Sequence, residues 1–179
     1  MATLRPDDLV FVDESGITTA MTRRYGRAPL GERARGWVPG GHWTQLTILG
    51  GLTLQGLIAC MSIEAATDLD VFRAFTVEVL IPQLRPGQVV ILDNLSPHKA
   101  QEIRELIEAA GCRLLLLPPY SPDLNPIEQA WSKLKTLLRS AAARTKEALE
   151  EALTAVIDQI TAADAKGWFT HAGYASNPN

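Results

Sequence analysis

The sequence has little cysteine, no long hydrophobic run and no excess of positive charge. Its two cysteines, Cys60 and Cys112, lie far apart in apolar surroundings, so we expect reduced core thiols and neither a redox pair nor a zinc site. No segment approaches the roughly 20 apolar residues of a membrane span, and the first residues have no signal-peptide core. We therefore expect a soluble, cytoplasmic protein without a membrane partner.

The net charge of −3 argues against a chain dedicated to nonspecific DNA binding. This average hides two basic runs. Residues 23–35 hold five arginines and one glutamate, and residues 133–146 hold five cations and no acid. A solvated charged face explains either run alone, but two such runs in an acidic protein suggest local contacts with a polyanion.

Hydrophobic patterning in the first half predicts three strands and a helix. The apolar run 9–13 indicates a strand buried on both faces. Residues 14–42 are rich in Gly, Pro and Arg, and we expect an inserted basic loop there. The stretches 44–52 and 54–63 predict a strand pair, and the 3.6-residue period from residue 67 predicts a helix that Pro82 ends.

The second half alternates between strands and helices. Strands are predicted at 87–94 and 112–119, and helices at 96–111, 126–139 and 145–160. The order βββαβαβα, with one or more further helices, predicts a single α/β domain over residues 1–179. The expected architecture is a ribonuclease-H-like fold: a mixed five-stranded sheet, with strands 1–3 antiparallel and strands 4 and 5 parallel, flanked by helices. A flavodoxin-like sheet would need a helix between the first two strands, and the basic loop offers none.

Three acids stand at element ends. Asp13 closes the first strand, Asp93 closes the fourth, and Glu128 opens the helix after the fifth. Carboxyl ends of parallel strands meet at one crevice, so the three carboxylates would converge there. Because they would repel one another, the cluster requires a cation. Without a His/Cys ligand set, that cation should be Mg²⁺, with Mn²⁺ as substitute, and two such ions serve in-line attack at phosphate.

Each acid also has a purely structural interpretation. Asp13 and Asp93 could belong to ordinary turns. Glu128 could fold back in a capping box with Asn125 as N-cap and Pro126 at the first helical position. It lies at the edge of an apolar stripe, which could face solvent or the crevice. His98, five residues after Asp93, is either a first-turn helix residue or a group near the scissile phosphate.

Four segments, "VFVDES", "GHWTQLTILGGLTLQGL", "VVILDNLSPHK" and "LLLLPPYSPDLNPIEQAWSKLK", resemble the DDE catalytic domain of mariner-like transposases, in particular the bacterial insertion-sequence branch. The likeness runs from about residue 8 to residue 140, and its most specific part is the proline-rich block that ends in Glu128. Thirty-four residues separate Asp93 from Glu128, as in that superfamily. The prolines would fix where the helix begins and so hold its carboxylate in place.

The resemblance implies a metal-bound triad of Asp13, Asp93 and Glu128 and cut-and-paste transposition, with terminal repeats and target DNA as substrates and a homodimer bridging both element ends. The basic runs would hold the DNA backbone through Arg23, Arg24, Arg27, Arg33, Arg35, Lys133 and Lys135. The family's N-terminal helix-turn-helix recognition region is absent. We therefore expect a separate or frameshift-joined recognition half, or a truncated relic.

Two other functions stay open on the sequence. One is a catalytically silent remnant or accessory subunit that binds DNA or a partner protein without cutting. The other is a ribonuclease-H-like nuclease unconnected with transposition. The presence of all three acids favours an active enzyme.

Overall fold

The computed structural model describes residues 5–93 and 101–174. Five strands form one sheet in the order β3-β2-β1-β4-β5. β1 pairs antiparallel with β2, and β2 with β3, whereas the β1–β4 and β4–β5 pairs are parallel. The strands are β1 (Leu9–Thr18), β2 (Gln45–Thr53), β3 (Gly56–Ile63), β4 (Val89–Leu92) and β5 (Arg113–Leu116). This topology confirms the predicted mixed sheet.

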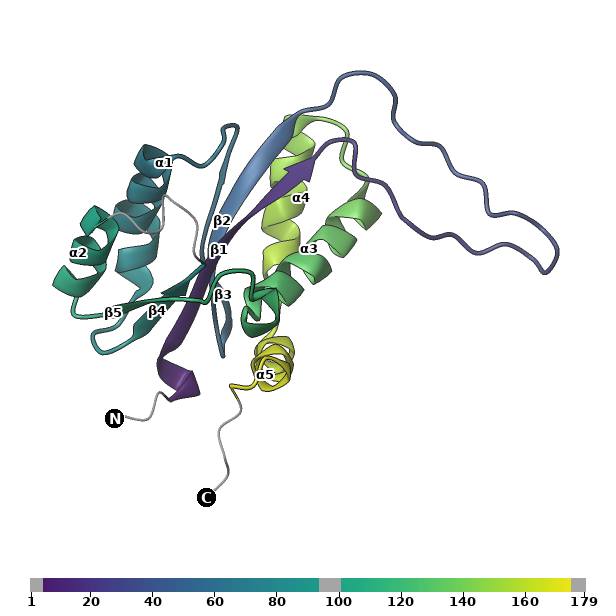
Figure 1. The fold of residues 1–179 in the computed structure, drawn as a ribbon. Coiled ribbons are helices and arrows are strands. Elements are labelled where there is room, and N and C mark those ends of the chain that lie inside the picture. The colour runs from purple at the N-terminus through teal and green to yellow at the C-terminus, as the bar shows by residue number, and fades with distance from the viewer. Residues whose placement is uncertain (1–4, 94–100, 175–179) are drawn as a thin grey trace.

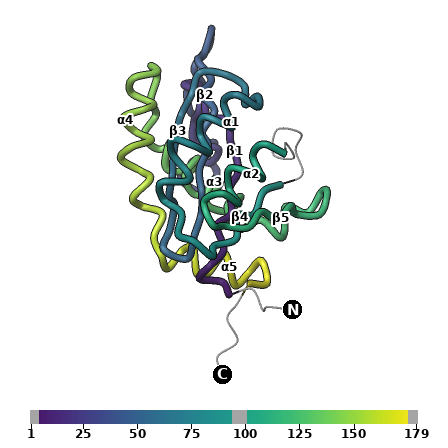
Figure 2. Tube along the Cα trace, turned by 90° about the vertical axis from the view of Figure 1, so that its left-hand side faces the viewer, coloured from purple at the N-terminus to yellow at the C-terminus, as the bar shows by residue number. Residues whose placement is uncertain are grey.

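Helices cover both faces of the sheet (Figures 1 and 2). α1 and α2 lie on one face, and α3, α4 and α5 lie on the other. Their bounds are α1 (Leu69–Ala74), α2 (Gln101–Ala109), α3 (Ile127–Ala141), α4 (Lys146–Ile157) and α5 (Ala162–His171). In the described part of the chain, no helix has the length and apolar character that a membrane crossing needs.

Strand alternation divides the core in two. Leu9 and Phe11 of β1 face α3, α4 and α5, whereas Val10 and Val12 face α1 and α2. Successive side chains of a strand point to opposite faces, so Asp13 belongs to the α3 face. α4 also packs there through Leu149, Leu153 and Val156, which are buried in the same core.

The first strand is longer than the sequence indicated. β1 continues past Asp13 to Thr18 because its register with β2 runs unbroken to the pair Thr18–Gln45. The basic loop is therefore shorter than 14–42, and we call residues 20–43 the arm. Its neck is closed by hydrogen bonds between Thr19 and Thr44, and beyond the neck it projects from the body without helix or strand (Figure 1).

The predicted helix from residue 67 is present, but its turns change. After α1 the chain widens to a π-helix over Phe75–Leu80 and then tightens to a 3₁₀ turn over Ile81–Gln83, which contains Pro82. Proline lacks the N–H donor that a continuing helix needs, which explains the ending. The helix predicted at 96–111 is described from Gln101, and Gly111 ends it at a φ of +75°.

The end of the chain adds to the predicted elements. The last predicted helix ended at residue 160, whereas the structure has a further helix, α5, followed by Tyr174, whose ring contacts Phe11. A capping box begins α5: the Thr161 side chain accepts from the Asp164 N–H, and Asp164 accepts from the Thr161 N–H. The pattern Thr-x-x-Asp is visible in the sequence, but the helical spacing of apolar residues that follows it is weak.

Gly50 makes room for the largest side chain of the α3 face. It pairs with Asp13 across β1 and β2, and a Cβ there would lie 2.9 Å from Trp131 Cη2 and 3.2 Å from Cys60 Sγ. Trp131 is fully buried and comes from the first turns of α3. The absence of a side chain at Gly50 therefore sets how closely α3 approaches the strand that carries Asp13.

We expect Gly50→Ala to lower the free energy of unfolding by about 1–3 kcal/mol, because the added methyl overpacks the core. Gly167→Ala is the matched control: Gly167 lies in α5 with no atom within 4 Å of the added Cβ, so alanine should stabilise by about 0.4–1 kcal/mol. Urea denaturation of both variants measures whether each substitution lowers or raises the free energy of unfolding. A neutral Gly50→Ala would contradict the packing argument.

Candidate active site

Asp13 lies where the pairing of β1 with β4 ends. The parallel pairing of β1 with β4 ends at Val12–Leu92, and among the described residues β1 pairs beyond it only with β2. Asp13 is thus the first residue of β1 after the β4 pairing, and it stands at the carboxyl end of β4 although not at the end of its own strand. Its side chain is buried, with 5% exposed.

Asp93 follows β4 directly. Since Val12 is level with Leu92, continuing the register sets Asp93 beside Asp13. Val89 and Ile91 face the α3 core, so the alternation directs the next odd residue to the same side. Asp93 is half-buried. The effect of the Asp93 charge on the pKa of Asp13 agrees with this placement.

Glu128 opens α3 on that same face. Ile127, Trp131, Leu134 and Leu138 are all buried, which confirms the apolar stripe, while Glu128 itself is exposed. The capping-box alternative is not seen: the N-cap is Pro126, without a side-chain cap bond, and the buried Asn125 Oδ1 accepts no hydrogen bond within the described chain.

The other acids act on the charge of Asp13. Burial, the largest cause, and the negative charges of Glu128, Asp93 and Glu14 together raise the pKa of Asp13 to about 7, against the opposing effect of the Glu14 backbone N–H, which donates to the carboxyl. A buried carboxyl with acids around it is a site short of positive charge. The shifted pKa of Asp13 is therefore the electrostatic sign of neighbouring acids at this point of the fold.

The acids fit a hard divalent cation in donor chemistry, because all three supply carboxylate oxygens. Among residues 5–93 and 101–174, however, no three His, Cys, Asp or Glu side chains form a group that could hold a metal ion as they stand. The side-chain positions are therefore not those of a closed ligand set. His98, the remaining predicted catalytic residue, lies outside the described residues.

Basic side chains adjoin the acids along α3. Lys135 follows Glu128 by seven residues and Arg139 follows Lys135 by four, which places all three on one side of the helix. Burial lowers the pKa of Lys135. The negative charges of Glu128 and Asp13 oppose this shift, and the positive charges of Arg139 and Arg24 add to it. Lys135 thus stands between the acids and a cluster of arginines.

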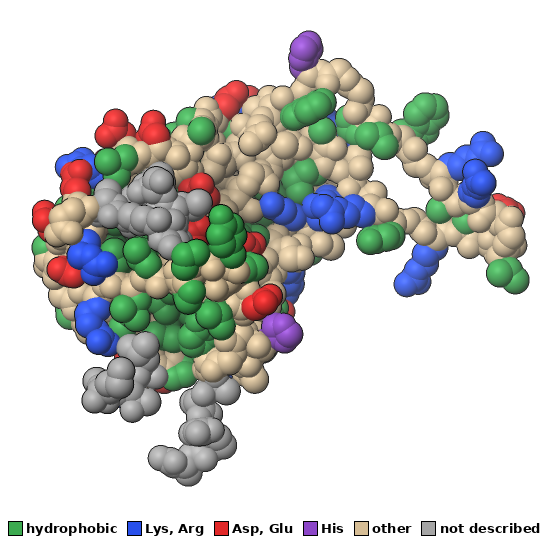
Figure 3. Space-filling model, viewed as in Figure 1, with side chains coloured by type: hydrophobic (Ala, Val, Ile, Leu, Met, Phe, Trp, Pro, Cys, Tyr) green, Lys and Arg blue, Asp and Glu red, His purple; other side chains and the backbone are tan. Residues whose placement is uncertain are grey.

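The arginines line a groove of about 710 Å³ between the arm and the end of α3. Figure 3 shows Lys and Arg side chains along the arm and at its base. Arg144 also fastens the arm by donating to the carbonyl oxygens of Thr19 and Met21. The charged and aromatic residues of the groove are Arg23, Arg24, Arg27, Arg35, Arg139, Arg144, Tyr25 and Trp37.

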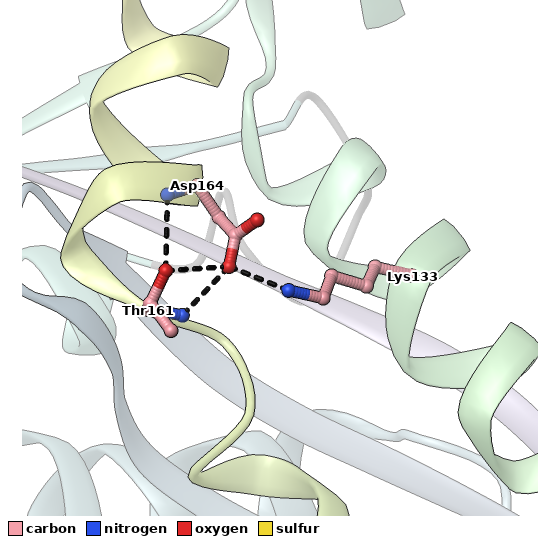
Figure 4. Close-up of polar contacts among 3 residues, drawn as sticks. All are labelled: Lys133, Thr161 and Asp164. Atoms are coloured by element: carbon pink, nitrogen blue, oxygen red, sulfur yellow. Dashed lines mark hydrogen bonds and ion pairs between the residues drawn. The ribbon is translucent and has the colours of Figure 1, made fainter.

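Lys133 lies elsewhere. Its Nζ is 2.6 Å from Asp164 Oδ2, so the lysine ties α3 to α5 (Figure 4). This lysine, and hydrogen bonds from Thr161, lower the pKa of Asp164 to about 2. Arg33 is exposed on the arm but is not part of the groove. Arg139 was missed as a site residue, although its helical spacing from Glu128 was a signal available in the sequence.

The strand order, with Asp13 and Asp93 at the carboxyl end of β4, defines a ribonuclease-H-like α/β protein. Within that class, the chain belongs to the DDE superfamily endonucleases, whose family model matches residues 8–150. A comparison with curated protein sequences finds no match.

Solved structures of the Mos1 mariner transposase share the fold. The Mos1 mariner paired-end complex with Mn has a TM-score of 0.73 at 14% identity, over 92% of this chain and 52% of that chain. The Mos1 strand transfer complex gives 0.70 at 16%, over 92% and 51%. The isolated Mos1 catalytic domain gives 0.60 at 14%, over 94% and 79%. This chain therefore spans about half the length of the chains in the first two structures.

The pKa of Asp13 predicts how stability depends on pH in the metal-free protein. A carboxyl whose folded pKa is raised from 3.8 to about 7 holds a proton that the unfolded chain releases, so stability falls as pH rises through that window. We expect Asp13→Asn to be more stable than the parent at pH 8, by up to about 4 kcal/mol, and similar to it near pH 4.

Urea denaturation in the presence of a chelator measures this difference at both pH values. The control is Asp158→Asn, which removes one charge at the exposed end of α4 and should change stability little. An Asp13→Asn variant with the same stability as the parent at pH 8 would show that burial does not perturb the carboxyl.

Proposed function

We propose that this chain is the catalytic domain of a transposase, which cleaves DNA phosphodiester bonds and transfers the freed strand to target DNA. The observation that carries the proposal is the buried Asp13, whose pKa burial and the negative charges of Glu128 and Asp93 raise, in a chain of the DDE endonuclease family. The fold is shared with Mos1 paired-end and strand transfer complexes, which supports the choice of strand transfer over simple hydrolysis.

Asp13, Asp93 and Glu128 would hold Mg²⁺, or Mn²⁺ as substitute, bound as two ions. Solved Mos1 complexes with Mn and with Mg support this choice. Bound cations of this kind activate the attacking hydroxyl and stabilise the leaving oxygen of an in-line displacement at phosphate. Asp13 must lose its proton to serve as a ligand, and cation binding would favour that loss because it supplies the missing positive charge.

The arginine groove would carry the DNA backbone to the acids. Lys135 and Arg139 continue the basic surface along α3 from the groove towards Glu128. Phosphate contacts from lysine and arginine fix the register of a duplex without reading its sequence. The exposed Tyr25 and Trp37 add aromatic surface to the same groove. Two copies of the chain would bridge paired DNA ends.

The first test is catalysis. We expect the protein to nick a plasmid that carries the DNA flanking its own gene when Mg²⁺ or Mn²⁺ is present, and Asp93→Asn to lower the rate at least about 100-fold, because removing one carboxylate ligand weakens cation binding. The charge-matched control is Asp158→Asn, remote from the acids and expected to be fully active. Metal-dependent nicking that survives Asp93→Asn would refute the assignment.

The second test concerns the groove. Replacing one phosphate-contacting cation should reduce the slope of log affinity against log salt by about one. We expect this loss for Arg139→Gln, measured by fluorescence anisotropy with a short duplex over a range of NaCl concentrations. Lys133→Gln is the matched control, since it removes one charge from the same helix on the side that faces Asp164. Equal slopes for the two variants would argue against DNA binding in the groove.

A further inference from the structure

Tyr174 packs against the strand that carries Asp13. Its ring centroid lies 4.9 Å from that of Phe11, and Phe11 in turn meets Phe169 of α5 edge-on at 5.2 Å. Phe11 precedes Asp13 by two residues in β1 and is fully buried. Aromatic pairs at these distances have a preferred geometry beyond simple burial, so the tyrosine ring is held against β1.

The hydroxyl of the same residue reaches the segment that carries Glu128. Tyr174 Oη donates to the carbonyl oxygen of Leu124 at 2.9 Å. Leu124 ends the 3₁₀ turn Pro122–Leu124 and is four residues before Glu128. One side chain therefore contacts two of the three elements that supply the acids, β1 through its ring and the entry to α3 through its hydroxyl.

A second attachment holds α5 to α3. The ion pair between Lys133 and Asp164 fastens the beginning of α5, and the capping box of Thr161 fixes the orientation of the Asp164 carboxylate (Figure 4). Tyr174 fastens the other end of α5. These contacts, from residue 161 to residue 174, lie beyond the segment 8–150 that matches the family.

We propose that Tyr174 is a positioning residue that sets the separation of Asp13 and Glu128. The inference rests on the proposed function, in which these two carboxylates bind one cation site. With β1 held in the sheet, the hydrogen bond to Leu124 fixes where the proline-rich segment delivers α3. Metal sites depend on such supporting contacts, because a displaced ligand binds more weakly even when its chemistry is unchanged.

Tyr174→Phe tests the hydroxyl alone, since the phenylalanine ring keeps its place against Phe11. We expect the affinity for Mn²⁺, measured by titration calorimetry without DNA, to fall about tenfold. Hydrogen exchange should also quicken at the amide of Glu128, which donates to the Asn125 carbonyl at 3.2 Å, and stay unchanged at Ile107 in α2 on the other face of the sheet.

Asp68→Ala is the control for a general loss of stability. Asp68 caps α1 on the opposite face by accepting from the Val71 N–H at 2.9 Å, so its removal should lower the denaturation midpoint and leave Mn²⁺ affinity and Glu128 exchange unchanged. Equal Mn²⁺ affinity in Tyr174→Phe and the parent would overturn the positioning role. If the parent binds no Mn²⁺, the proposed metal site fails, and exchange at Glu128 alone then decides whether Tyr174 positions α3.

Discussion

The buried carboxyl of Asp13 is the constraint on which the rest of this structure depends. A carboxylate that is 5% exposed and has Glu128 and Asp93 for electrostatic neighbours is costly to ionise. Within the described residues, this acid lies where the pairing of β1 with β4 ends. Hydrophobic packing on both faces of the sheet holds the backbone there, so the acid cannot relax outward to solvent.

The segment that leads into α3 is also conformationally restricted. Pro118, Pro119, Pro122 and Pro126 restrict the chain between β5 and Glu128, and Tyr120 within that segment adopts a left-handed φ of +56°, which is costly for a non-glycine residue. Gly50 lets Trp131 approach the sheet, and Tyr174 ties the carbonyl of Leu124. Backbone restriction, core packing and one hydrogen bond thus together determine the position of Glu128.

The sequence predicted what depends on short-range pattern. Buried runs that end in Asp13 and Asp93, and a helix that begins near Glu128, were legible because strand and helix periods are local. Contacts between distant segments were not. The extension of β1 to Thr18 depends on its pairing with β2, the ion pair of Lys133 depends on where α5 packs, and the order of Tyr174 depends on Phe11. No local signal near any of these residues specifies its partner.

Charge along α3 explains how an acidic chain can present a basic surface. Glu128 lies in the first turn of the helix, and Arg139 lies in the last turn, on the same side, where Arg24 acts on its pKa. Lys135 lies between the two, and both the acids and the arginines affect its pKa. Within a Debye length of about 8 Å at physiological salt, a polyanion at the arginines would experience local attraction and not the net charge of −3. It would still be repelled where the acids begin. A cation among Asp13, Asp93 and Glu128 would remove that repulsion, so binding of metal and of backbone phosphate should reinforce each other.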